Sequence, residues 1–231
     1  MKIRLFVCLM VCLVSTNVFS QSNGLAFGGL YEIIISKGNQ IYLDSIASKL
    51  DLKEHIDLSN PGGIAIYYTS KSGPKTEGEA GISLLAKNAV LKNDSGASLG
   101  INNRIAGLHF GLNYYPTRWL VAGAQFKVSN FSGRVKYSNP ASDTLFQFTP
   151  DNINFMIGYS VGIRPQVGFS IPFTPANSNK DRGMRILAFY DLGLSRYRFY
   201  DAYDKIMPFE GNKKTFTSGY GVELTFYFRG S

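Results

Sequence analysis

Two histidines and their neighbours are the residues best suited to carry out chemistry. His55, Asp57 and Ser59 together supply an imidazole, a carboxylate and a hydroxyl, the groups used in nucleophilic acyl transfer. A strand would place all three on one face, whereas a helix would spread them. His109 lies in a segment of alternating polarity, where it could titrate inside a polar interior. We favour the simpler interpretation that His109 is a buried hydrogen-bonding residue.

Charged residues recur on the polar side of other alternating segments. Together with His109, these candidates for a polar, charged interior are Glu32, Glu79, Lys127, Arg164, Arg185, Asp191 and Glu223. Because buried charges must be paired, we interpret them as a salt-bridged plug. The alternative is a polar conduit.

Motifs for other chemistries are missing from the sequence. It contains no P-loop, no nucleotide-binding glycine pattern after a strand and no set of histidines or carboxylates at metal-binding spacing. We therefore expect no cofactor, no metal and no catalytic residue, and classify the chain as a non-enzyme.

The first 20 residues have the pattern of a secretory signal peptide. Lys2 and Arg4 precede an apolar run from Leu5 to Val14, and small polar residues follow. The run is about 10 residues long, whereas a spanning helix needs about 20. We expect cleavage after Ser20, with residues 21–231 forming the mature domain.

The net charge of the mature chain limits the kinds of partner that it could bind. Without Lys2 and Arg4, the other 22 Lys and Arg residues exceed the 16 Asp and Glu residues by six. The basic clusters are short and no nucleic-acid-binding motif accompanies them, so we expect no nucleic-acid partner. A modest positive balance suits a protein beside anionic lipid headgroups.

Alternation with a period of two residues dominates the mature chain and predicts strands with two different faces. We expect strands at 25–35, 63–70, 78–88, 104–115, 120–128, 152–173, 185–197 and 219–228. Short connectors (71–77, 116–118 and 174–183) alternate with long ones (36–62, 89–103, 129–151 and 198–216). This predicts an all-β, eight-stranded antiparallel up-and-down transmembrane barrel with short periplasmic turns and longer outer loops.

Three segments depart from simple alternation. The aromatic residues Tyr114, Tyr115 and Trp119 surround a tight turn and predict a girdle at a membrane surface, the alternative being a soluble core. The 152–173 segment exceeds the roughly 9–11 residues that a spanning strand needs, so it either projects from the membrane or splits at Pro165. Residues 44–57 suggest a short helix in the first outer loop, capped by Asp44 or Ser45.

The composition of the polar faces separates a membrane barrel from a soluble sandwich. Both folds use alternating strands. In this sequence the apolar faces are uniformly large, whereas the opposite faces carry Gly, Ser, Asn and Gln with few charges. Small polar residues suit a narrow filled lumen, and large apolar ones suit lipid. We therefore favour the barrel over a secreted sandwich.

The chain resembles small outer-membrane β-barrel proteins of the OmpA/OmpX-like type, in the form found in Bacteroidetes-type envelopes. The residues that carry the resemblance are the Ser20/Gln21 junction, the turn at 114–117 and the strands at 160–173 and 219–228. The resemblance, which places the chain in a porin-like family, implies an outer-membrane location in a Gram-negative-type bacterium. It also implies contact with outer-membrane lipid and a structural or interaction role in which outer loops meet envelope or surface proteins.

Two alternative functions follow from the same resemblance. The family also contains accessory barrels of protein-secretion systems. Some eight-stranded outer-membrane enzymes that act on lipid A place His, Asp and Ser near the outer rim, which would assign catalysis to His55 here.

Overall fold

The computed structural model describes residues 22–35, 44, 59–92, 98–138, 153–175, 180–198, 214–216 and 218–230. Its strands are β1 (Ser22–Ile35), β2 (Gly62–Lys71), β3 (Thr76–Lys92), β4 (Ser98–Tyr114), β5 (Leu120–Ser138), β6 (Ile153–Pro172), β7 (Lys180–Gly193), β8 (Arg196–Arg198), β9 (Lys214–Phe216) and β10 (Ser218–Gly230). Among these residues, no helix is long and apolar enough to cross a bilayer.

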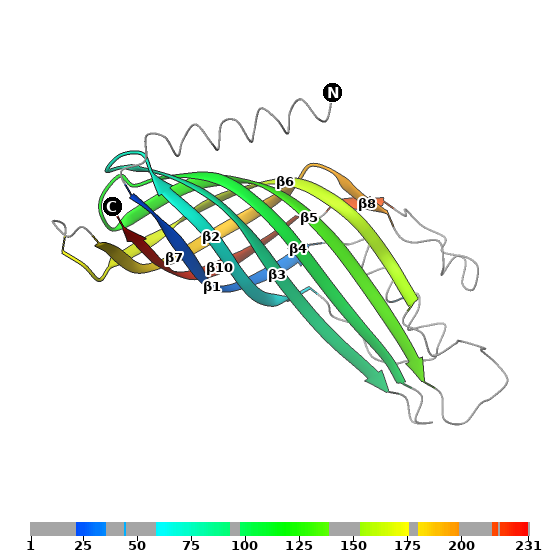
Figure 1. The fold of residues 1–231 in the computed structure, drawn as a ribbon. Coiled ribbons are helices and arrows are strands. Elements are labelled where there is room, and N and C mark those ends of the chain that lie inside the picture. The colour runs from blue at the N-terminus through cyan, green and yellow to red at the C-terminus, as the bar shows by residue number, and fades with distance from the viewer. Residues whose placement is uncertain are drawn as a thin grey trace.

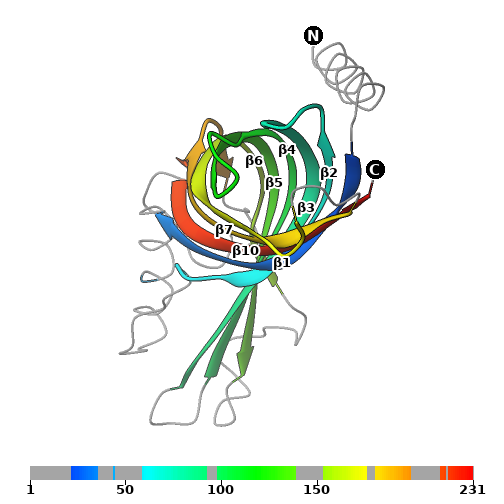
Figure 2. The ribbon, with the colours of Figure 1, turned by 90° about the vertical axis from the view of Figure 1, so that its left-hand side faces the viewer.

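Eight of the strands close into a barrel in the order β1-β10-β7-β6-β5-β4-β3-β2, and all neighbours are antiparallel. The pairing of β1 with β10, from Asn23↔Gly230 to Ile35↔Ser218, joins the two ends of the sheet. Figure 2 looks into the resulting ring, and Figure 1 shows the start of β1 and the end of β10 at the same end as the short turns. The predicted eight-stranded antiparallel barrel is confirmed.

The two faces of each strand differ in polarity because successive side chains point to opposite sides of a sheet. Outward side chains are large and apolar, as at Leu84, Leu112 and Phe169, and they are exposed on the outer surface. Inward side chains are mostly small, polar or charged. Gly81 lies opposite Tyr67 and leaves room for its ring, since a Cβ at Gly81 would meet Tyr67 Cδ1 and the Ile66 carbonyl oxygen. The narrow interior is therefore filled by side chains.

Strands β3 to β6 are longer than the others and extend beyond the long-loop end of the barrel (Figure 1). In this extension the polarity of the two faces is exchanged. Most outward positions become polar, with Asn88, Arg104 and Arg134 exposed, although Val90 is exposed as well. The inward row becomes apolar, because Ile105 lies beside Phe131 on β5 and both are buried. The exchange divides the outer surface of the sheet into an apolar part and a mostly polar part.

This exchange explains why several predicted strand ends were wrong. We expected loops at 89–103 and 129–151, but β3 runs to Lys92, β4 begins at Ser98 and β5 runs to Ser138. The backbone continues as a strand, but the apolar residues move from the outward to the inward positions. The sequence pattern of alternating apolar and polar residues is therefore interrupted at this point. At the other side, β7 ends at Gly193, and Arg196–Arg198 instead pairs with β9 in a separate two-stranded sheet.

The long 152–173 segment is one strand, β6, and does not split at Pro165. Pro165 pairs in register with Ala124 of β5. On the β7 side the register passes from Ile163↔Leu192 to Gln166↔Phe189. A proline has no N–H to donate, so the interruption falls on one neighbour only and the strand count is preserved.

Several sequence expectations lie outside the described residues. These are the signal peptide at 1–20, its cleavage after Ser20, and the catalytic candidates His55 and Asp57. Of the helix expected at 44–57, the described part is Asp44, which has helical conformation.

Replacing Gly81 tests how tightly the interior is filled. Gly81→Ala should lower the free energy of unfolding by about 1–3 kcal/mol, because the added methyl group overpacks the Tyr67 ring. The measurement is urea unfolding of the barrel in lipid vesicles. Gly29→Ala is the matched control, since nothing lies within 4 Å of a Cβ at Gly29. Equal stability of the two variants would contradict a filled interior.

Candidate functional site

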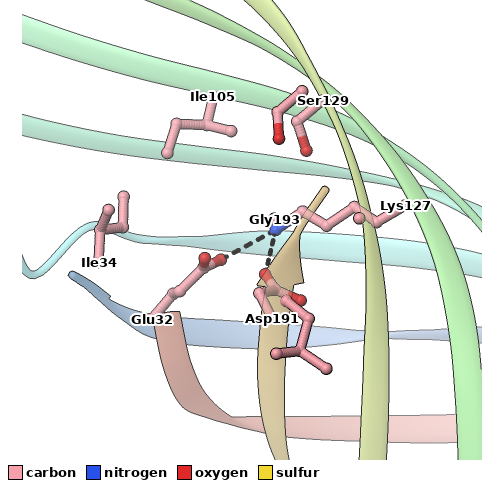
Figure 3. Close-up of a pocket in the computed structure, with 10 residues that line it drawn as sticks. Glu32, Ile34, Ile105, Lys127, Ser129, Asp191 and Gly193 are labelled. Carbon is pink, nitrogen blue, oxygen red and sulfur yellow. Dashed lines mark hydrogen bonds and ion pairs between the residues drawn. The ribbon is translucent and has the colours of Figure 1, made fainter. Parts of the chain in front are cut away.

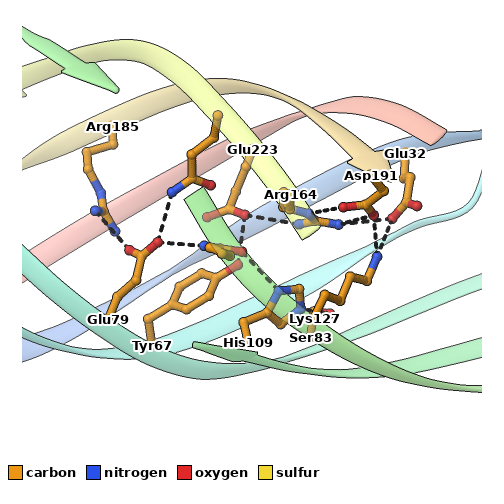
Figure 4. A network of polar contacts seen from close by, with 12 residues as sticks. Glu32, Tyr67, Glu79, Ser83, His109, Lys127, Arg164, Arg185, Asp191 and Glu223 are labelled. Atoms are coloured by element: carbon orange, nitrogen blue, oxygen red, sulfur yellow. Dashed lines mark hydrogen bonds and ion pairs between the residues drawn. The ribbon is translucent and has the colours of Figure 1, made fainter. Parts of the chain in front are cut away.

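The barrel interior holds all eight of the predicted polar candidates. Each of these residues is at most 7% exposed: Glu32, Glu79, His109, Lys127, Arg164, Arg185, Asp191 and Glu223. They come from seven strands and form two groups of polar contacts along the lumen (Figure 4), which meet where the Tyr67 ring contacts His109. Within the described ranges, no three His, Cys, Asp or Glu side chains are grouped as a metal site requires.

The layer nearest the long-loop end is built on Asp191. Arg164 donates to both oxygens of this carboxylate, from Nε at 2.6 Å and from Nη2 at 2.7 Å. Lys127 Nζ bonds the same carboxylate and also Glu32 Oε2 at 3.2 Å (Figure 3). Arg164 Nη2 reaches Glu32 Oε2 at 3.2 Å. Two cations from β5 and β6 thus hold two carboxylates from β1 and β7.

A small cavity of about 20 Å³ adjoins this layer, beside Glu32, Lys127 and Asp191 (Figure 3). A cavity needs roughly 10–15 Å³ to hold one water molecule. The space therefore suits a single water and is too small for an organic ligand.

The next layer couples Arg164 to Glu223. Arg164 Nη1 lies 3.8 Å from Glu223 Oε2, and Tyr67 donates its hydroxyl to the same oxygen at 2.8 Å. The Arg164 guanidinium carbon also lies 3.8 Å from the centroid of the Phe189 ring, a cation–π contact. Arg164 therefore contacts groups from β1, β7 and β10 at once.

Glu79 and Arg185 form the third layer. Arg185 Nη1 lies 2.7 Å from Glu77 Oε1 and 3.2 Å from Glu79 Oε2. The Glu79 Oε1 atom accepts from the amides of Gln125 at 2.5 Å and Gln166 at 2.9 Å. Each buried carboxylate oxygen of Glu79 thus has at least one donor.

The layer at the short-turn end was not foreseen. Arg229 bonds Glu77, donates from Nη1 to Asp181 at 2.8 Å and from Nε to Thr69 at 3.1 Å. Lys71 Nζ lies 2.9 Å from Asp181. The signal was present in the sequence, because Glu77 and Arg229 keep the inward phase of Glu79 and Glu223. The expected strands, 78–88 and 219–228, stop one residue short of Glu77 and Arg229 and so exclude both.

The charges of this network nearly cancel. Among the described residues, the buried carboxylates are Glu32, Glu77, Glu79, Asp191 and Glu223, and the buried cations are Lys127, Arg164, Arg185 and Arg229. Desolvating so many charges is tolerable only when each has a partner in good geometry. The arrangement fits a structural plug, since paired and desolvated groups hold one another in place.

His109 makes a triad-like set of contacts in the same lumen. Its Nε2 lies 2.7 Å from Ser83 Oγ, and its Nδ1 lies 3.0 Å from Gln125 Oε1. Because Gln125 Oε1 can only accept, Nδ1 carries the proton, and Nε2 accepts from the serine hydroxyl. All three side chains are buried, and neither cavity described for the chain is lined by any of them. A substrate has no access, so we interpret the set as a hydrogen-bonded lumen contact.

Apolar side chains line the lumen beyond the charged network. Leu85, Ile105 and Phe131 lie side by side in register on β3, β4 and β5, and Ile34 points inward from β1. All four are buried. These side chains lie between the charged network and the long-loop end.

The three aromatic residues of the predicted girdle do not share one environment. Tyr114 is 48% exposed on the outer surface and Trp119 is 55% exposed in the turn, whereas Tyr115 is 6% exposed. Assigning Tyr115 to the girdle was wrong, because adjacent side chains point to opposite faces. Its hydroxyl donates to Glu77 Oε2 at 2.9 Å inside the short-turn end. Burial and the nearby Glu77 carboxylate raise the pKa of Tyr115 above its ordinary value, so the hydroxyl stays protonated.

Comparison with known proteins finds similar shapes at low sequence identity. No family model matches the chain. No curated protein matches it either. Similar solved structures include Ail, the attachment invasion locus protein of Yersinia pestis, in complex with the heparin analogue sucrose octasulfate, at 8% identity and a TM-score of 0.49, covering 90% of this chain and 97% of that one. The outer membrane protein OprG from Pseudomonas aeruginosa is 11% identical with a TM-score of 0.48, covering 91% and 96% of the two chains. Neisserial surface protein A is 11% identical with a TM-score of 0.38, covering 90% and 96%.

Removing Arg164 tests whether the network stabilises the barrel. Arg164→Gln should lower the free energy of unfolding by about 3–5 kcal/mol, because it leaves buried carboxylates without their shared cation. The measurement is urea unfolding in lipid vesicles. Arg104→Gln is the control, since an exposed arginine of the extension should contribute within about 0.5 kcal/mol. A loss at Arg164 no larger than at Arg104 would contradict the plug.

Proposed function

We propose that this chain is a non-enzymatic integral outer-membrane barrel that displays an extramembrane sheet and its connecting loops to surface or envelope partners. The proposed orientation places the short turns in the periplasm and the extension of β3 to β6 outside the cell. Short periplasmic turns and longer outer loops are the usual arrangement in such barrels.

The observation that carries the proposal is the apolar outer surface of a closed barrel. Large side chains such as Leu25, Ile64 and Val167 are each more than half exposed on it. Water would penalise so much exposed apolar surface, whereas lipid would not. Closure also leaves no unpaired sheet edge at membrane depth, as a bilayer requires. Both properties favour outer-membrane lipid as the surroundings of the barrel.

The lumen argues against transport and catalysis. Its buried charges are paired in two groups, and apolar side chains lie beyond them. Eight strands usually leave an interior just wide enough for side chains to fill. A filled lumen supports a structural role, in which function resides on the exposed surfaces. Of the other candidate functions, the lipid A-modifying enzyme depends on His55, which lies outside the described residues, and no described contact favours a secretion accessory over display.

The extension supports a display role. Its outward face is mostly polar and its inward row mostly apolar, which is the polarity of a sheet with one face in water. Within the polar face, Arg104 donates from Nε to Asn102 at 2.9 Å. A sheet of this kind carries the loops away from the lipid surface, where protein partners can reach them.

Single cysteines can test the orientation, because both native cysteines, Cys8 and Cys12, lie in the predicted signal peptide. In intact cells, a membrane-impermeant maleimide should label Asn88→Cys on the extension. It should label Gly73→Cys in a short turn only after the outer membrane is permeabilised. Leu84→Cys on the apolar outer surface should stay unlabelled until the protein is denatured. Labelling of Gly73→Cys in intact cells would reverse the proposed orientation.

Two further measurements test the membrane location and the filled lumen. The unboiled protein should migrate differently from the boiled protein on SDS gels, as a detergent-resistant barrel does. In planar bilayers it should give no sustained conductance steps. Recovery in the soluble periplasmic fraction would refute the membrane location, and stable porin-like steps would refute the filled lumen.

A further inference from the structure

A second, larger cavity lies at the short-turn end of the barrel. Its volume is about 230 Å³, and it is lined by the basic side chains of Lys71, Lys75, Arg118 and Arg229 together with Asp181. We propose that this cavity is a binding site for a small soluble oxyanion, such as a phosphate group or a carboxylate carried by a periplasmic molecule. This site is distinct from the surfaces that would serve display.

The charges around the cavity favour an anion. Four cations line it against one carboxylate, and Asp181 is already held by Lys71 at 2.9 Å and by Arg229 at 2.8 Å. Glu77 lies behind Arg229 and is shared with Arg185. The deeper lumen, by contrast, has more buried carboxylates than buried cations. The positive excess is therefore local to this mouth.

Lys75 and Arg118 supply that excess. Among the described residues, no carboxylate lies within ion-pair distance of either side chain, and Arg118 Nη2 donates to the Thr174 carbonyl oxygen. Lysine and arginine form their strongest hydrogen bonds with ionised oxygen acceptors. An oxyanion seated between them would complete the charge pairing that the deeper layers already have.

The frame of the cavity is rigid. Pro74, Pro116 and Pro172 line it, one from each short turn or its adjoining strand end, and a proline ring fixes φ. The Thr117 Oγ1 atom accepts from the backbone N–H of Trp119 at 3.3 Å and of Leu120 at 3.2 Å, which closes the turn that carries Arg118. A rigid frame reduces the entropy that is lost when an anion binds.

The size and position of the cavity limit the ligand. Pockets for drug-sized molecules are typically about 300–1,000 Å³, so 230 Å³ suits a single small group. Tyr115, Tyr227 and Arg229, which point into the barrel, form its walls, with the Arg229 guanidinium 4.2 Å from the Tyr227 ring. The cavity thus lies inside the ring of strands, and the anion would enter from water and not from the lipid around the barrel.

The only tryptophan of the chain, Trp119, adjoins Arg118 and provides a probe. We would titrate the folded mature barrel, in nanodiscs of neutral lipid, with inorganic phosphate against chloride at matched ionic strength, and follow Trp119 fluorescence. Equilibrium dialysis with labelled phosphate would give the Kd independently. The proposal expects a saturable phosphate response that chloride does not produce.

A double variant and a matched control separate the site from general charge effects. Lys75→Gln with Arg118→Gln should weaken phosphate binding by about tenfold or more, because both are expected to donate charge-assisted hydrogen bonds to the anion. Arg104→Gln with Arg134→Gln removes the same charge from the extension and should leave the Kd unchanged. A heat-dependent gel shift would verify that both variants are folded.

Three results would overturn the proposal. The first is a phosphate response equal to that of chloride. The second is an equal loss of affinity in the two double variants, which would reduce binding to net charge. The third is a response that appears only when anionic phospholipid replaces neutral lipid in the nanodiscs, because it would assign the cations to headgroups. The proposed display role is independent of all three, since gel shift and cysteine labelling test it separately.

Discussion

The burial of charge inside a narrow barrel is the constraint on which the rest of the structure depends. Arg164 is fully buried, and a lone guanidinium there would be prohibitively costly. It is accommodated because Asp191, Glu32 and Glu223 approach it from three other strands. Pairing of this kind needs the correct register of every strand that contributes, so the network also acts against register slips. The backbone ladder and the lumen charges therefore specify the same closed arrangement.

The environment outside the barrel sets the second condition. Where the outer surface is apolar, the interior can be polar. Where the outward positions turn polar, beyond Leu84 on β3 and Val128 on β5, the inward row turns apolar at Leu85, Ile105 and Phe131. One continuous sheet is thus apolar on its outer side along one stretch and mostly polar along the next, as the proposed membrane location requires. Each strand buries its apolar side chains against whichever side excludes water.

The sequence predicted the closed barrel and its inward charges well, because the phase of alternation is read directly from residues such as Lys127 and Glu223. It could not reveal which charges meet, since the contact of Arg164 with Glu32 depends on the packing of strands far apart in the chain. Strand ends were missed where the phase reversed, as at Ile105. Tyr115 was assigned to the wrong face because an aromatic residue beside a turn fits a girdle and a lumen equally well.

The two ends of the lumen differ in polarity and in charge, so the barrel is asymmetric along its axis. At one end the charged network stops at an apolar layer, beside a cavity of about 20 Å³ that has room for a water alone. At the other end it opens into a basic cavity of about 230 Å³ in a frame that contains three prolines. A plug needed only for stability would be served by balanced charge at both ends. The excess of Lys75 and Arg118 at one end is not required by the pairing within the plug, which is why an anion from the aqueous phase is the natural partner for that mouth.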